Sequence, residues 1–212
     1  MLNYMLEYFM TKCKLYRKED ERNMSNRRAA IRRERKEREK IAKNKSENGK
    51  LLQAQSRGID AGRTISATVV MNALFLELQW SKTKILEFTE SLSQQSANGN
   101  PDVIAFALQP WIDKFETRIQ AHSPVMPKMS ITDVIQGIEY QHRNISYVNC
   151  CALMFLNLYS NFDLRSNNKG TGKLDKIINQ CVIHFHDLLR NPYDYTADKC
   201  IERTEKITGI QL

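Results

Sequence analysis

Beyond the first quarter of the chain, apolar residues recur at three- and four-residue steps, the spacing of one face of an α-helix. The run 64–79 is apolar on most sides and predicts a long buried helix. The same periodicity predicts helices over 82–95 and 102–121. We expect Pro110 to divide the last one into two pieces, because proline cannot donate the helical hydrogen bond.

A second series of helices is expected after the proline-containing stretch 123–130, which is typical of a linker. Segment 145–158 again predicts a long buried helix. A loop over 166–172 and a shorter helix follow, and the last expected helix covers 196–208.

Residues at the expected helix ends support these boundaries. Ser81 or Thr83 can cap the helix over 82–95, because both hydroxyls can accept a hydrogen bond from a free backbone amide. Gly209 follows the last expected helix and is typical of a helix stop.

Short matches at a nearly constant offset indicate an internal repeat. The chain is therefore expected to be all-α, a helical bundle built from two similar three- to four-helix halves and preceded by a basic N-terminal helix. The alternative is one irregular helical domain with coincidental similarity. The matches pair residues 58–60 with 137–139, 63–66 with 143–146, and 75–78 with 155–158.

The expected organisation has five parts. Residues 1–23 are interpreted as a non-native extension, with Met24 as the natural start, or else as a short helix. Residues 24–47 form a basic arm, and residues 48–122 form the first helical repeat. The linker over 123–130 and the second helical repeat over 131–212 complete the chain.

Positive charge is concentrated in the basic arm. The chain carries a formal charge of +8, and the segment 24–45 alone accounts for +7, with ten basic residues against three acidic ones. The arm contains strong helix formers without Pro or Gly, and Glu34 and Arg38 have the spacing of a supporting ion pair. The basic residues are Arg27, Arg28, Arg32, Arg33, Arg35, Lys36, Arg38, Lys40, Lys43 and Lys45.

Two interpretations of this arm stay open. It is either a phosphate-binding helix that contacts nucleic acid or a nucleoprotein, or a solvated extension that improves solubility. Arginine is prominent in it, and the planar guanidinium fork suits phosphate.

Cysteine and histidine usage indicates no defined catalytic or metal site. The five Cys are odd in number and lack a framework spacing, so a reducing setting in the bacterial cytoplasm is expected. Cys181, His184 and His186 form one metal-like group, to which Cys200 or His142 would have to add ligands. Core packing is the preferred interpretation, so neither a cofactor nor a metal is expected.

Known catalytic and nucleotide-binding motifs are absent, so we expect that the protein is not an enzyme. Gly170-Thr171-Gly172-Lys173 is superficially similar to a phosphate loop. It lacks the earlier glycine, and Leu174 stands where a Ser or Thr would reach magnesium. A flexible loop before a helix is the better interpretation. No apolar run is long enough to cross a membrane.

Tyrosines offer candidate contacts to a protein partner. Tyr193 and Tyr195 follow a proline and flank one acidic residue, so exposed rings there are candidate anchors. The alternative is local packing in a turn. An exposed helix face is also compatible with a homodimer.

A resemblance to a known group of proteins indicates a biological setting. The segments 27–33 (RRAAIRR) and 173–178 (KLDKII) are similar to those of short helical proteins of phages and prophages of Gram-positive bacteria. Segment 205–210 (EKITGI) is similar to their closing Glu-x-x-Gly-Ile but has one residue more before the glycine. The resemblance implies a phage-like origin. Small phage proteins of this size often act as regulators or as inhibitors of host enzymes, including anti-CRISPR proteins.

These observations favour a non-enzymatic interaction protein. The leading hypothesis is a phage-type inhibitor of a host defence nucleoprotein, which contacts nucleic acid or its binding groove. The alternative is a direct DNA- or RNA-binding accessory factor in transcription or replication, although no helix-turn-helix with a basic recognition helix can be placed in the body.

Overall fold

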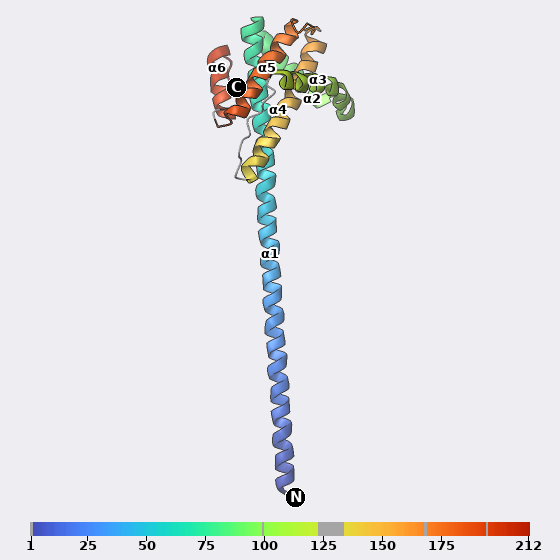
Figure 1. Ribbon diagram of the computed structural model, residues 1–212, viewed down its shortest axis with the longest axis vertical. Helices are drawn as coiled ribbons and strands as arrows, with labels where there is room; N and C mark the ends of the chain where they lie inside the picture. Colours follow the sequence, from blue (N-terminus) through green and yellow to red (C-terminus); the bar gives the residue numbers. More distant parts are fainter. Residues whose placement is uncertain (1, 99, 123–133, 168, 194) are drawn as a thin grey trace. The chain divides into compact units, whose positions relative to one another are not determined.

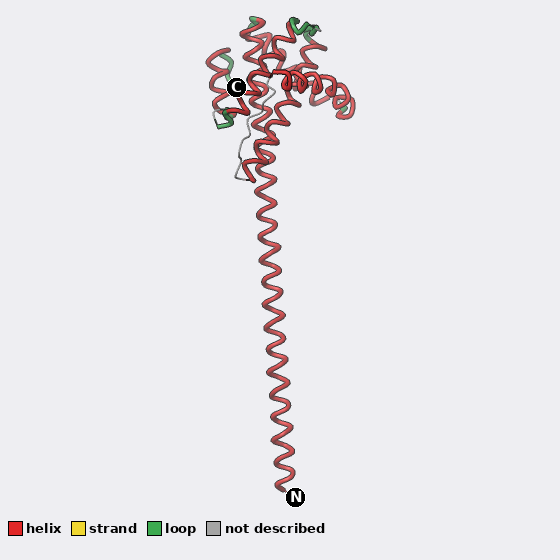
Figure 2. The backbone as a smooth tube through the Cα atoms, viewed as in Figure 1, coloured by secondary structure: helices red, strands yellow, loops and turns green. Residues whose placement is uncertain are grey.

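The computed structural model consists of helices joined by loops (Figures 1 and 2). Within the described residues there are six helices and no strand, which confirms the all-α prediction. The backbone is described for residues 2–98, 100–122, 134–167, 169–193 and 195–212, and side chains for these residues except 2–31, 34, 96–98 and 101. The helices are α1 (Leu2–Leu78), α2 (Lys82–Asn98), α3 (Pro101–His122), α4 (Val134–Asn161), α5 (Lys173–Arg190) and α6 (Ala197–Thr208).

The chain divides into two compact units, residues 1–50 and residues 51–212. Helix α1 contributes to both, and we call residues 51–212 the body. The expected linker over 123–130 lies outside the described residues. Across the described part of the chain, no helix is both long and apolar enough to cross a membrane.

The predicted helix ends agree with the structure at two places. The Ser81 hydroxyl accepts a hydrogen bond from the Lys84 amide at 3.3 Å, so Ser81 caps the start of α2. Gly209 has a φ of 65° and ends α6, where its amide donates to the Glu205 carbonyl at 2.8 Å.

The prediction at Pro110 is wrong, because α3 runs without interruption through this proline. The ring removes one amide donor, which leaves the carbonyl of residue 106 without its usual helical partner. Phe106 is 86 % exposed and Pro110 is also exposed, so water can solvate that carbonyl. An exposed proline therefore does not break this helix.

Two glycines let α1 and α4 cross at close range. A Cβ at Gly58 would overlap the Glu139 carbonyl oxygen, and one at Gly62 would overlap the Arg143 carbonyl oxygen. The Ser146 hydroxyl donates to the Ile59 carbonyl at 2.8 Å in the same crossing. Larger side chains would separate the two helices, so these positions need glycine.

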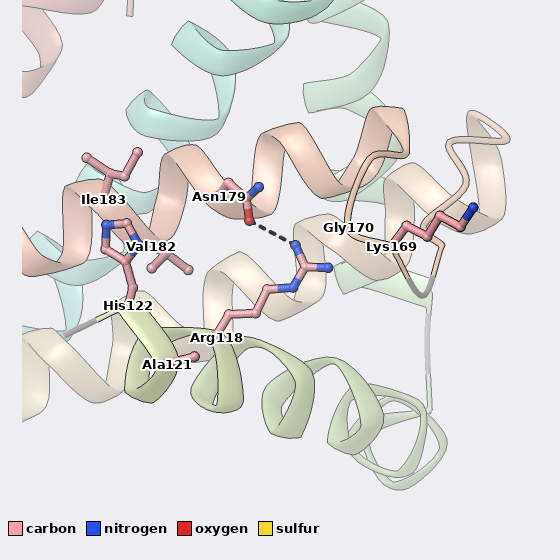
Figure 3. Close-up of a pocket in the computed structure, with 8 residues that line it drawn as sticks. All are labelled: Arg118, Ala121, His122, Lys169, Gly170, Asn179, Val182 and Ile183. Atoms are coloured by element: carbon pink, nitrogen blue, oxygen red, sulfur yellow. Dashed lines mark hydrogen bonds between the residues drawn. The ribbon is translucent and has the colours of Figure 1, made fainter. Parts of the chain in front are cut away.

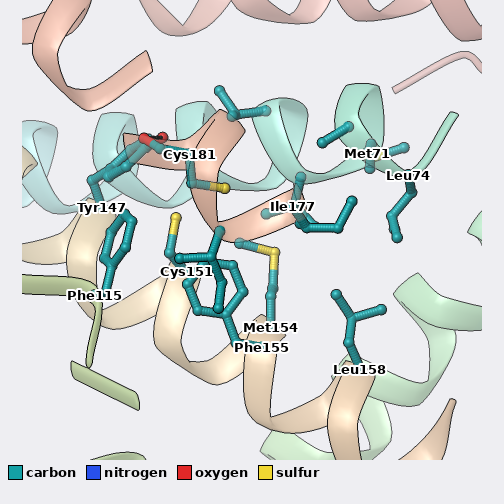
Figure 4. Packing of buried hydrophobic residues seen from close by; sticks show 14 of the residues in the cluster. Met71, Leu74, Phe115, Tyr147, Cys151, Met154, Phe155, Leu158, Ile177 and Cys181 are labelled. Atoms are coloured by element: carbon teal, nitrogen blue, oxygen red, sulfur yellow. Dashed lines mark hydrogen bonds between the residues drawn. The ribbon is translucent and has the colours of Figure 1, made fainter. Parts of the chain in front are cut away.

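The core of the body takes buried side chains from all six helices, and Figure 4 shows part of it, with residues of α1, α3, α4 and α5. Phe115 packs edge-on against Phe155 at 5.4 Å between ring centroids. The fully buried Tyr147 donates its hydroxyl to the Cys181 carbonyl at 3.0 Å, which satisfies its one polar group. The two long helices, α1 and α4, thus share one core.

The expected buried stretch 145–158 is correct only in part. Ile145 is 49 % exposed, whereas Ile65, its counterpart in the proposed repeat, is fully buried. Tyr147 begins the buried stripe that continues through Cys151 and Phe155 at four-residue steps. Ile145 is two residues before Tyr147, so it lies on the opposite side of α4.

Candidate nucleic-acid interface

The basic segment, residues 24–47, belongs to α1. Every described side chain from Arg32 to Lys45 is exposed to solvent. The side chains of Arg27, Arg28 and Glu34 lie outside the description, so the pairing expected between Glu34 and Arg38 is not described. Full exposure means that the local interactions of this helix, rather than a core, must support it.

Some of the charge is neutralised within the helix. Arg35 forms an ion pair with Glu39 at 3.1 Å, and Lys43 approaches Glu47 at 4.0 Å, each four residues apart. Five other cations make no ion pair with any described residue. They are Arg32, Arg33, Lys36, Lys40 and Lys45.

Three of these cations follow one side of the helix. Arg32, Lys36 and Lys40 are four residues apart, so neighbouring Cβ atoms lie on the same side, separated by a rise of about 6 Å. A row of exposed cations with this spacing can contact the phosphates of a nucleic acid strand.

The two tyrosines predicted as partner contacts differ in their surroundings. Tyr193 is 67 % exposed and meets the ring of Tyr140 edge-on at 6.1 Å. Tyr195 is half-buried, packs against the core, and has the His184 ring edge-on at 4.8 Å. Local packing therefore occupies Tyr195, and Tyr193 is the ring that is available to a partner.

Beside Tyr193 lies an arginine that sequence reasoning did not single out as a site residue. Arg143 is buried, with its guanidinium 4.6 Å from the centre of the Tyr140 ring. It donates to the Pro192 carbonyl at 3.3 Å and to the Asn144 side chain, and no described carboxylate pairs with it. Burial lowers the pKa of Arg143. Pro192 is 49 residues away from Arg143 in the chain, so no local sequence pattern indicates this contact.

Cys181, His184 and His186 do not converge. Cys181 is buried in the core, and a His186 ring nitrogen lies 3.1 Å from the Ile119 carbonyl oxygen. His184 packs on Tyr195 instead, and burial, followed by the charge of Arg203, lowers its pKa. The described residues contain no group of three or more side chains suited to a metal ion.

Three cysteines have thiols that are held in the protonated form. Burial raises the pKa of Cys150, Cys151 and Cys200. A thiolate nucleophile requires the opposite shift, and a buried, protonated thiol packs as a small apolar group.

The loop before α5 is held by one buried carboxylate. The amides of Asn167 and Gly172 donate to the Asp175 Oδ2 atom at 2.8 and 3.0 Å. The Ser166 hydroxyl donates to Oδ1 at 2.5 Å. These contacts fix a loop that the sequence predicted to be flexible, and they occupy amides that a phosphate-binding loop would need.

Lys114 and Arg118 from α3 share the same carboxylate. Their side-chain nitrogens lie 3.6 and 2.5 Å from the Asp175 Oδ1 atom. Burial alone would raise the pKa of Asp175, but hydrogen bonds from Ser166 and Asn167 and the charge of Arg118 leave it below its ordinary value. We call Asp175, Lys114, Arg118 and Ser166 the Asp175 cluster.

Comparisons of the chain with protein-family models, with curated proteins and with solved structures found no match.

Proposed function

We propose that the protein is a non-enzymatic interaction protein whose basic segment binds the phosphate backbone of nucleic acid. The observation that carries this proposal is the set of five exposed cations without a described ion pair, three of which follow one side of α1. An isolated helix of this composition is solvated on all sides, and an anionic partner would stabilise it.

Two features of the body support a role in binding rather than in catalysis. The thiols of Cys150, Cys151 and Cys200 have raised pKa values, so they are poor nucleophiles at neutral pH. Tyr193 presents an exposed ring that contacts Tyr140, which in turn lies against the buried Arg143, and Tyr and Arg are frequent anchors of protein interfaces.

The preferred biological setting is inhibition of a host defence nucleoprotein. In this proposal the basic segment contacts nucleic acid, or occupies its groove, and Tyr193 contacts the protein component. The similarity of the sequence to short phage proteins favours this setting over a transcription or replication accessory factor, which is the second candidate.

Fluorescence anisotropy with labelled DNA and RNA over a salt series tests the nucleic-acid contact. The substitutions R32Q/K36Q/K40Q remove three cations from one side of α1. For double-stranded DNA, the slope of log K against log salt should fall by about 2.7, since each phosphate contact contributes about 0.9. Lost contacts also weaken binding at fixed salt.

A matched control removes the same charge elsewhere. Lys173, Lys176 and Arg190 are exposed on α5, so K173Q/K176Q/R190Q has the same net charge as the first variant. Its salt slope should remain that of the unmodified chain. Equal losses in both triple variants would contradict a specific role of the basic segment and would indicate nonspecific attraction by net charge.

The inhibitor and the accessory factor differ in their preferred partner. An inhibitor should bind an assembled nucleoprotein more tightly than the free strand, and Tyr193→Ala should weaken only the former. An accessory factor should bind the free strand at least as tightly, without loss in that variant.

Light scattering on the same samples determines whether the protein is a homodimer.

We also propose that the body consists of two similar halves, one formed by the end of α1 with α2 and α3, the other by α4, α5 and α6. The common order of one long and two shorter helices supports this, as do the buried Ser66 and Ser146 on the long helices. Superposition of the halves in a crystal structure should bring these serines together. A fit that requires another helix order would contradict the duplication.

A further inference from the structure

We propose that a pocket between α3, α5 and the loop before α5 binds a small organic anion, with its charged group at Arg118 and its apolar part on Val182 and Ile183. The pocket has a volume of about 550 Å³, within the range of small-molecule sites. This site belongs entirely to the body, and it does not rest on nucleic-acid binding by the basic segment.

The walls of the pocket combine apolar and polar groups at opposite ends (Figure 3). Ala121, Val182 and Ile183 supply an apolar surface at the end near His122. Arg118 reaches from α3 toward Asn179 on α5, and Lys169 with Gly170 lies at the other end. No acidic side chain is among the described residues that line it.

Charge around Arg118 is not balanced. The side chains of Lys114 and Arg118 are 32 % and 21 % exposed, and both share the single, fully buried carboxylate of Asp175. Two cations and one carboxylate leave one positive charge on side chains that are only partly exposed. A partly buried excess of positive charge attracts an anion, and an anion in the pocket would approach it through Arg118.

Arg118 is held in position before any ligand arrives. One terminal nitrogen donates to Asp175 at 2.5 Å, and the other donates to the Asn179 side chain at 2.9 Å. These bonds fix the plane of the guanidinium, so little further ordering is needed on binding. Lys169 is exposed at the rim, where it adds a second cation.

Four probes separate the contributions of charge and apolar surface. Benzoate and phenyl phosphate carry both, benzyl alcohol carries only the ring, and inorganic phosphate carries only the charge. Binding is followed by NMR through the Arg118 side-chain NH, the Asn179 amide and the methyl groups of Val182 and Ile183. Benzoate should bind about tenfold more tightly than benzyl alcohol, and the four side chains should respond together.

The relative affinities of benzoate and phenyl phosphate identify the charged group. Tighter binding of benzoate indicates a carboxylate ligand, and tighter binding of phenyl phosphate indicates a phosphate ester. Benzyl alcohol binding as tightly as benzoate would overturn the proposal, as would the absence of shifts at these four residues. If a 5′-phosphorylated oligonucleotide shifts these four residues more than either small anion does, the proposal of a small ligand is wrong and the ligand is a strand end.

Substitutions at the rim test the site without disturbing the Asp175 cluster. Lys169→Gln should weaken benzoate binding about threefold, whereas Lys176→Gln, on α5 but outside the pocket, should leave it unchanged. Ile183→Glu adds a negative charge to the apolar wall and should weaken binding about tenfold, with Ile183→Gln as the uncharged match. Equal effects of the two lysine variants, or of the two Ile183 variants, would refute the assigned position.

Discussion

The basic segment and the body hold their cations under opposite conditions. In the segment, Arg32, Lys36 and Lys40 are exposed and unpaired within the described residues. In the body, Lys114 and Arg118 surround one buried carboxylate. Exposed cations cost the fold little and remain available to a partner, whereas partly buried cations around a buried carboxylate depend on each atom near them.

Removal of one carboxylate from each region should give the largest difference in the free energy of unfolding. Asp175→Asn leaves Lys114 and Arg118 without their counter-charge and should lower the free energy of unfolding by about 3 kcal/mol. Glu39→Gln removes the exposed partner of Arg35 and should leave that free energy unchanged. Urea unfolding followed by tryptophan fluorescence reports on the body, since Trp80 and Trp111 both lie in it. Equal stability of the two variants would contradict the contrast.

Two glycines of α1 extend the comparison of the two regions, because Gly49 lies just after the basic segment and Gly62 lies in the body. Gly62→Ala places a methyl group against the backbone of α4 and should lower the free energy of unfolding by about 2 kcal/mol. Gly49→Ala meets nothing within 4 Å and should favour the local helix by up to about 1 kcal/mol. Urea unfolding measures the first effect, and hydrogen exchange of the amides around residue 49 measures the second. A stabilised Gly62→Ala variant would show that the crossing is looser than described.

The smallest expected effect concerns pH. Burial and the charge of Arg203 lower the pKa of His184, so the unfolded chain binds a proton at a higher pH than the folded one. The stability that neutral His184 provides is present above about pH 6.5 and decreases as the pH falls below that value. His184→Gln should flatten this dependence in urea unfolding at pH 5 to 7. The segment 24–47 contains no histidine, so its salt-dependent binding should not change over that range.

A large part of the fold followed from the sequence because its signals are local. The periodic apolar positions of α2, its Ser81 cap and the Gly209 stop each depend on residues within one turn. The prediction that Pro110 divides α3 was wrong because the effect of this proline depends on whether water reaches the carbonyl of residue 106. Exposure of that carbonyl is a property of the packed molecule, not of the proline.

The candidate sites also differ in whether their residues are close together in the sequence. The charged residues of the basic segment are adjacent in sequence, so their common exposure was predictable. The environment of Arg143 and the Asp175 cluster are assembled from separate segments. Asp175 stands three residues after Gly172, which is a capping signal, whereas the sequence was interpreted as a flexible loop before a helix.

The late position of α6 has a consequence for synthesis. Cys200, Thr204 and Ile210 bring buried side chains to the body from a part of the chain that follows the other five helices. While the chain grows, the basic segment is made before α6, and the body cannot complete its core until α6 has followed. The exposed cations of the segment are therefore present on the growing chain before the body has completed its core.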